Sequence, residues 1–258
     1  MARIMKYELI KNRFRYLVMI AVMLLAEGAF LIANARNYEV AVGMLIILGL
    51  AAWGTLFIII LEGIAMYNRD LREKSGYMVF MTPLPAWQIL LGKILVILAV
   101  GSALFLSYSL LAYLDLHLLS QSLAKANVSI TANFAASILD SLYGAKTIVL
   151  LLRALAYLLC FVSFFVCLAY LSSTVSTSLL RGKKGEKAIS FFLFIGLVIL
   201  VSVISSRLMG DADFAFSISQ EGLDIHMKNQ IVGAIIYLVS AGASFLASAY
   251  LLDKKVDI

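Results

Sequence analysis

Apolar residues run through the chain in long blocks, and polar residues gather in the segments between the blocks. A helix that crosses the hydrocarbon core of a bilayer needs about 20 predominantly apolar residues. Six blocks reach that length, and they predict six transmembrane helices at 17–35, 40–66, 89–116, 147–171, 188–206 and 230–252. Because no linker divides these blocks, we expect an all-α, polytopic membrane protein with a single transmembrane domain over residues 1–258.

The composition supports lipid rather than water as the solvent of this chain. Hydrophobic residues make up 63% of the sequence and charged residues only 14%, whereas a soluble domain is about half apolar and a quarter charged. The net charge of +6 comes from basic residues that flank the apolar blocks. There they set topology and meet anionic lipid, so the charge does not indicate nucleic-acid binding.

The orientation of the helices follows from where lysine and arginine lie. Most of those outside the apolar blocks fall in the N-terminal segment, the second and fourth connections and the C-terminal tail. The positive-inside rule places these segments, and hence both chain ends, in the cytoplasm. We expect a plasma membrane, in a bacterium. The run Ala33-Asn34-Ala35 resembles a signal-peptide cleavage site, but the long first block and Glu27 within it favour a retained helix.

The first sixteen residues are patterned as an amphipathic helix. Apolar side chains recur at steps of three and four residues, at Ile4, Tyr7, Ile10, Phe14 and Leu17. Such a helix lies in the membrane interface with its apolar side toward lipid. The alternative is a basic flank that only sets topology.

Ionisable groups inside a membrane span are costly and indicate function or pairing, and we single out Glu27, Glu62 and Arg153 for that reason. Glu27 and Arg153 lie at similar depths from the same predicted membrane face, so we expect an intramembrane ion pair. The alternative is that one or both line a polar route for a substrate. Glu62 lies near the cytoplasmic end of the second block, where it either extends to the interface or pairs with a basic residue such as Arg69.

The connection at 67–87 is longer than a turn requires and carries apolar residues of its own. Leu71, Lys74, Met78 and Met81 share one face of a predicted short helix that ends at Thr82-Pro83. An apolar face outside the lipid indicates a docking surface for another protein. A self-packed elbow at the interface is the other interpretation.

Signatures of covalent or hydrolytic chemistry are absent from the sequence. Residues 182–187 lack the spacing and hydroxyl of a phosphate-binding loop, and neither a His-Glu-x-x-His nor a Gly-x-Ser-x-Gly pattern occurs. His117 and His226 belong to no metal-ligand cluster, and Cys160 and Cys167 read as small apolar residues. We therefore expect a conduit or part of one, with no catalytic residue, cofactor site or metal site on this chain.

The second connection resembles the permease subunits of type-2 ATP-binding-cassette exporters. Residues 70–85 combine a charged patch with an apolar segment that ends in Thr82-Pro83-Leu84, and Gly92-Lys93 follows at the start of the third span. The six-span layout and the patterned N-terminal helix are also similar to that family. The resemblance implies that the connection forms a coupling helix, which rests on a separate ATPase subunit carrying ATP and Mg.

The resemblance also assigns residues and partners. It implies that polar contacts to the ATPase come from Arg69, Asp70, Arg72, Glu73 and Lys74. It implies that a groove of the ATPase is filled by Tyr77, Met78, Phe80 and Met81. Two ATPase subunits need two permease halves, so a second permease subunit is implied. We expect an amphipathic peptide or drug as the substrate. The alternative function is a ligand-binding or scaffolding membrane subunit that forms no transport pathway.

Overall fold

The computed structural model describes residues 2–36, 38–72, 85–125, 145–180, 185–209, 218–219, 222–223 and 227–254. In these ranges the chain forms seven helices and one small antiparallel hairpin. The helices are α1 (Ala2–Lys11), α2 (Arg13–Arg36), α3 (Tyr38–Arg72), α5 (Ala86–Lys125), α7 (Ala145–Leu180), α8 (Glu186–Met209) and α9 (Met227–Lys254). The hairpin joins β1 (Ile218–Ser219) to β2 (Gly222–Leu223).

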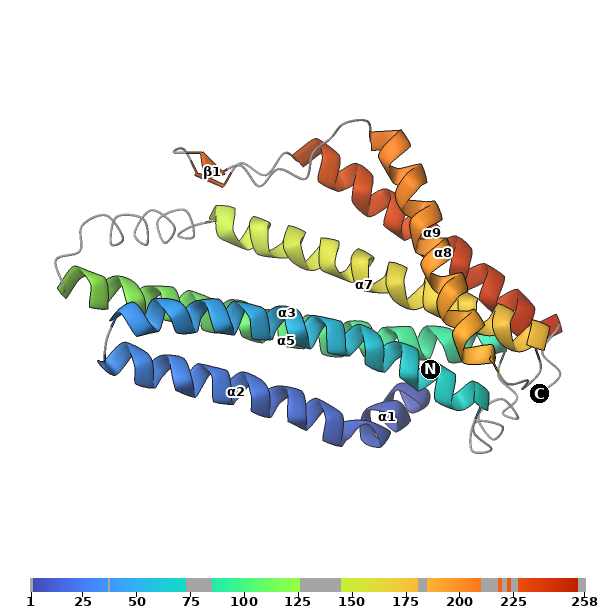
Figure 1. The fold of residues 1–258 in the computed structure, drawn as a ribbon, viewed down its shortest axis with the longest axis horizontal. Helices are drawn as coiled ribbons and strands as arrows, with labels where there is room; N and C mark the ends of the chain where they lie inside the picture. The colour runs from blue at the N-terminus through green and yellow to red at the C-terminus, as the bar shows by residue number, and fades with distance from the viewer. Residues whose placement is uncertain are drawn as a thin grey trace.

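The long helices form an elongated bundle with the short α1 at one end (Figure 1). Helices α2, α3 and α5 run alongside one another, and α7 packs against both α3 and α5 on the side away from α2. Helices α8 and α9 are inclined to that group and meet α7 near the end that holds α1. We refer to the end that holds α1 as the N-terminal end; it is the end that the charge pattern predicts to be cytoplasmic.

Six of the described helices are long and apolar enough to cross a membrane, which confirms the predicted number of spans. The protein is therefore a membrane protein built on six such helices. Several helices continue beyond the predicted apolar blocks; α5, for example, runs to Lys125 rather than to 116. A hydropathy pattern reports the lipid-embedded part of a helix, whereas hydrogen bonding continues the helix into polar sequence. The β1–β2 hairpin was not predicted.

The helix starts have local causes. Pro85 precedes α5, and its carbonyl oxygen accepts a hydrogen bond from the Gln88 amide at 2.9 Å. Gly185 precedes α8 with a φ of 112°, in the left-handed region that glycine adopts without strain. Between α1 and α2, the Asn12 side chain donates to the carbonyl oxygen of Glu8 at 3.1 Å. The backbone carbonyl oxygen of Asn12 accepts a hydrogen bond from the backbone amide of Arg15 at 3.0 Å. Asn12 thus supports the bend where the two helices meet.

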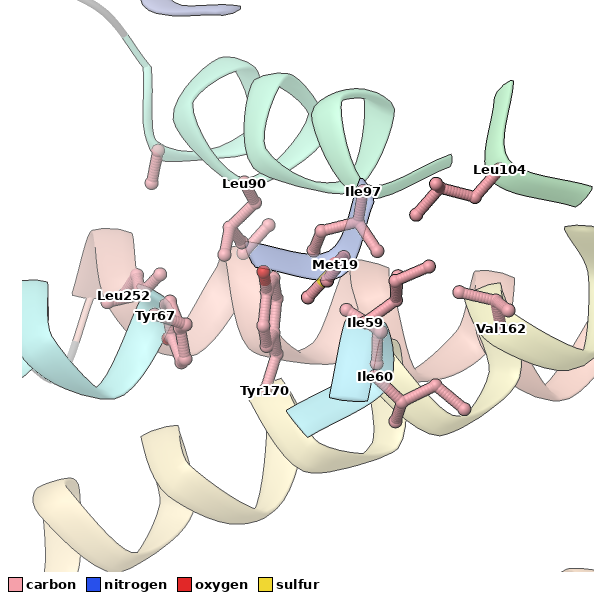
Figure 2. Close-up of a cluster of buried hydrophobic side chains, with 13 residues drawn as sticks. Met19, Ile59, Ile60, Tyr67, Leu90, Ile97, Leu104, Val162, Tyr170 and Leu252 are labelled. Atoms are coloured by element: carbon pink, nitrogen blue, oxygen red, sulfur yellow. The ribbon is translucent and has the colours of Figure 1, made fainter. Parts of the chain in front are cut away.

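The main apolar core lies where α2, α3, α5, α7 and α9 come together toward the N-terminal end (Figure 2). Tyr67 of α3 and Tyr170 of α7 stack there with ring centroids 4.2 Å apart. Their hydroxyl groups are not left unpaired: Tyr67 bonds with Thr174, and Tyr170 donates to the carbonyl oxygen of Gly63 at 3.2 Å. Satisfied hydroxyls are necessary here because an unpaired polar group in an apolar interior is costly.

A second apolar cluster lies between α2, α3 and α5, farther from the N-terminal end. It consists of buried residues of these three helices, namely Met23, Phe30, Ala41, Leu48, Tyr108 and Leu119. The remaining apolar surface faces outward, as on α8, where Phe191 and Phe192 are both exposed. Such faces are expected where the surrounding solvent is lipid.

The apolar stripe predicted over the first sixteen residues is divided between two helices, because α1 ends at Lys11 and α2 begins at Arg13. Tyr7 and Ile10 of α1 and Phe14 of α2 are exposed, whereas Ile4 is half-buried and faces Gly92 of α5. The placement of the exposed apolar side chains in the membrane interface stays a prediction.

The close approach of α3 to α5 and α7 predicts an effect of enlarging Gly63. A Cβ atom at this position would lie 2.5 Å from Cδ1 of Ile97 and 3.4 Å from Cγ2 of Val166. We expect Gly63→Val to lower the free energy of unfolding by about 1–3 kcal/mol, because overpacking forces neighbouring helices apart. Thermal unfolding of the purified protein in mild detergent measures this loss.

Gly54→Val is the matched control on the same helix, because no atom lies within 4 Å of a Cβ built there. It should leave the unfolding temperature nearly unchanged, and Ile97→Ala should restore part of the stability of the Gly63 variant. Equal losses from the two glycine variants would contradict the close packing described here.

Candidate functional site at the N-terminal end of the bundle

A lysine with no exposure to solvent joins three helices at the N-terminal end. Lys93 of α5 is 0% exposed, and its ammonium group donates to Oε1 of Glu8 in α1 at 2.6 Å and to Oδ2 of Asp70 in α3. The other oxygen of Asp70 accepts from Lys11 at 3.2 Å. Glu8, Lys11, Asp70 and Lys93 are called the Lys93 cluster below.

The Lys93 cluster balances its own charge, with two carboxylates against two ammonium groups. Removing charges from water costs several kcal/mol per ion, and only close, well-oriented partners recover that cost. Glu8 and Asp70 are almost fully buried, so each depends on Lys93 for compensation. Removal of one partner therefore leaves an uncompensated charge inside the protein.

A second group of polar side chains continues the network between α1, α2 and α3. Arg69 donates to Oε1 of Glu62 at 3.1 Å and to Oδ1 of Asn12 at 2.9 Å, and Arg15 of α2 also pairs with Glu62. Asn12, Arg15, Glu62 and Arg69 are called the Glu62 cluster below. The structure thus shows the Glu62–Arg69 pair that the sequence left as one of two possibilities.

Gly92 explains how α1 comes close enough to α5 for these contacts. A Cβ atom at Gly92 would lie 3.2 Å from Cγ2 of Ile4, which is tighter than ordinary packing. A larger side chain there would move α1 away and lengthen the Glu8–Lys93 contact. In the Gly92-Lys93 pair of the sequence motif, Gly92 therefore allows α1 to pack closely, and Lys93 neutralises the buried carboxylates.

The residues predicted to contact an ATPase divide into described and undescribed ones. The side chains of Arg69 and Asp70 lie within the protein's own clusters, and Arg72 is the last residue of α3. The others, Glu73, Lys74, Tyr77, Met78, Phe80 and Met81, lie outside the described residues. Contact of any of these residues with an ATPase stays a prediction.

The intramembrane charges of the sequence lie on different helices. Glu27 of α2 is a charged neighbour of Asp115 of α5. Arg153 lies on an exposed face of α7. The predicted pairing of Glu27 with Arg153 stays a prediction, because the charged neighbour found for Glu27 is a second acid.

Sequence reasoning missed Glu8 and Asp115, and it used Lys93 as evidence for topology and as part of the Gly92-Lys93 motif, without predicting a partner for it. A signal was present for two of them, because Lys93 and Asp115 both lie inside the predicted third span at 89–116. A charged residue at such a position requires a partner. Glu8 carried no such signal, since it lies among basic residues of a polar segment.

The part of the chain that the structure describes contains no cluster of metal-ligating side chains. No group of three or more His, Cys, Asp or Glu side chains lies close enough there to hold an ion. What the described residues form at the N-terminal end is a set of ion pairs, which is suited to holding helices together.

We compared the chain with protein-family models, with characterised proteins and with solved structures, and none of the three comparisons gave a match. The resemblance to exporter permeases therefore rests on the residues of the second connection and on the layout of the spans.

Replacement of Lys93 should be more harmful than replacement of any other cation of the Lys93 cluster. Lys93→Met leaves two buried carboxylates with reduced compensation, and we expect a loss of about 3–5 kcal/mol in the free energy of unfolding. Denaturation of the purified protein, together with its yield from membranes, measures the effect.

Lys11→Met is the matched control, because the Lys11 side chain is 25% exposed and pairs with the same Asp70. Its loss should stay within about 1 kcal/mol, as for other partly exposed pairs. Neutralising the carboxylates as well, with Glu8→Gln and Asp70→Asn, should recover part of the stability lost in Lys93→Met. A Lys93→Met protein as stable as Lys11→Met would show that the buried charge is not what holds these helices.

Proposed function

We propose that this chain is the transmembrane permease half of an ATP-driven exporter, with alternating access powered by a separate ATPase subunit. The substrate we propose is an amphipathic peptide or drug. In this proposal the ATPase subunit carries ATP and Mg, and the chain itself has no catalytic role. The protein lies in a plasma membrane with both chain ends on the cytoplasmic side.

The observation that carries the proposal is the pairing of Asp70 with Lys93. Asp70 lies close to the end of α3, before the connection at 73–84, and Lys93 lies near the start of α5, after it. The ion pair therefore joins the two helices that enter and leave the connection. A force applied to that connection would move α3 and α5 as a unit rather than bend one of them.

The Lys93 and Glu62 clusters extend this unit to α1 and α2. Glu8 links α1 to α5, and Glu62 links α3 to α2 through Arg15. Closure of two ATPase subunits on the connection would thus displace four helices together. Rigid-body movement of packed helices is a common way to switch the access of a cavity.

A second permease subunit is part of the proposal, because two ATPase subunits need two permease halves. Helix α8 supports it: within the described chain it packs against α7 and α9, and its outer face is apolar. Such a face suits either lipid or a second subunit.

A co-purification experiment tests the proposed function. A tagged chain is extracted from its native membrane in mild detergent, and the ATPase activity of whatever co-purifies is measured. We expect an ATPase subunit with the wild type. Changing Met78→Asp and Met81→Asp together should abolish its recovery, because charges on the docking face cannot enter an apolar groove.

The matched control carries Met78→Leu and Met81→Leu, which keep the apolar character and approximate volume of both positions. It should retain the ATPase subunit. If repeated mild extractions of a folded wild-type chain yield no ATPase, the exporter proposal fails, and a ligand-binding or scaffolding subunit becomes the better description. If the Leu and Asp variants lose the ATPase subunit to the same extent, the apolar character of Met78 and Met81 is not what forms the docking face.

A further inference from the structure

Glu27 and Asp115 meet inside the second apolar cluster. Along α2, Glu27 lies between Met23 and Phe30, at helical steps that place all three on one face. Along α5, Asp115 shares a face with Tyr108 and Leu119 in the same way. Two carboxyl groups from different helices are therefore set among apolar side chains.

Asp115 has no donor to satisfy it among the described residues. Its exposure is 0%, and neither carboxyl oxygen accepts a hydrogen bond from the described part of the chain. One oxygen of Glu27, Oε2, is also buried without a donor there. The charged neighbour that the structure gives Asp115 is the Glu27 carboxyl, which when ionised can only accept a hydrogen bond.

The charged groups of the surrounding helices lie elsewhere. On α1 and α3, the described residues Glu8, Lys11, Glu62, Arg69 and Asp70 belong to the two clusters at the N-terminal end, and Lys6 is exposed. On α2, Arg13 and Arg36 are exposed. On α7, Arg153 lies on an exposed face. The tyrosines of α7 and α9 that the structure places in ring contacts face one another or the tyrosine of α3, as in Tyr157–Tyr237 and Tyr67–Tyr170. On α5 itself, His117 contacts Gln121.

Two ionised carboxylates at this range repel strongly, because a low-dielectric interior does not screen them. Either a proton or a cation must lie between them. Calcium takes six to eight oxygen ligands, and magnesium an octahedral set, whereas the described residues bring two carboxyl groups together here. A proton needs no further ligand, since it lets one carboxyl group donate to the other.

We infer that Glu27 and Asp115 form a proton-binding site that joins α2 to α5 within the membrane. With the proton bound, one carboxyl group donates to the other and the pair carries a single negative charge. Loss of that proton leaves two facing anions, which weakens the contact between α2 and α5. The inference does not depend on the proposed exporter function.

Infrared spectroscopy of the purified full chain in lipid nanodiscs tests the site. A protonated carboxylic acid absorbs separately from an ionised carboxylate, and surface carboxyl groups are ionised at neutral pH. We expect the wild type to show a protonated-acid band at neutral pH. Asp115→Asn should remove one acid equivalent, and the double variant with Glu27→Gln should show the same loss.

Glu62→Gln is the control, because Glu62 has cationic partners, Arg15 and Arg69, in place of a second acid. It should leave the protonated-acid band of the wild type in place. If Asp115→Asn does not fold, Glu27→Gln replaces it in the comparison. A band that persists unchanged in the double variant would overturn the inference.

Thermal unfolding as a function of pH gives a second readout. The folded state holds a proton that an unfolded carboxyl group releases above about pH 4. Raising the pH from there, until the folded site itself loses the proton, draws the equilibrium toward the unfolded state. The wild type should therefore lose stability as the pH rises, more steeply than Asp115→Asn. If instead the wild type lacks the acid band and is stabilised by Na⁺ or Mg²⁺ through Asp115, a cation fills the site and the proton assignment is wrong. Absence of both the band and any cation effect would also overturn it.

Discussion

Neutralisation of the buried Lys93 ammonium group constrains the whole N-terminal end of this protein. The group has no access to solvent, so its compensation has to come from side chains held in place around it. Glu8 and Asp70 provide it from two other helices, and each of them depends on Lys93 in return. The position of α1, the separation of α3 from α5 and the need for Gly92 all follow from this requirement.

The apolar packing reinforces the same end of the bundle. The Tyr67–Tyr170 stack joins α3 to α7 close to the Lys93 cluster, and its hydroxyl groups bond within the protein. In lipid, apolar surface alone does not drive helices together, because the hydrocarbon chains are equally apolar. Close packing at Gly63, satisfied hydroxyl groups and ion pairs therefore carry more of the association than they would in a soluble protein.

The two sets of buried charges differ in a way that matters for movement. The Lys93 cluster contains as many cations as anions and holds its helices together without any added ligand. The Glu27–Asp115 pair contains two acids and no cation among the described residues, so its contact depends on what binds between them. The Lys93 cluster would keep the helices together at the N-terminal end, while the contact between α2 and α5 at Glu27 and Asp115 changes with what is bound there. The bundle could then change shape at one end and stay intact at the other.

Much of the architecture could be predicted from the sequence because lipid imposes a length and a composition on each spanning helix. Each of the six apolar blocks therefore corresponds to one helix. Helices α5 and α7 extend beyond their blocks, because backbone hydrogen bonding continues into the polar sequence that follows. The outward-facing positions of Tyr7 and Ile10 on α1 agree with the spacing of apolar residues along that helix.

The partners of the charged residues were decided by the tertiary structure alone. The pairing of Glu27 with Arg153 stays a prediction, and the acidic neighbour of Glu27, Asp115, was not foreseen. Lys93 was counted among the basic residues of the second connection, although it lies buried between Glu8 and Asp70. The sequence by itself determined which residues are charged and how deep each lies along its own helix. Which of them meet depends on the rotation of each helix about its axis and on the choice of neighbours, and both are set by packing between residues far apart in the chain.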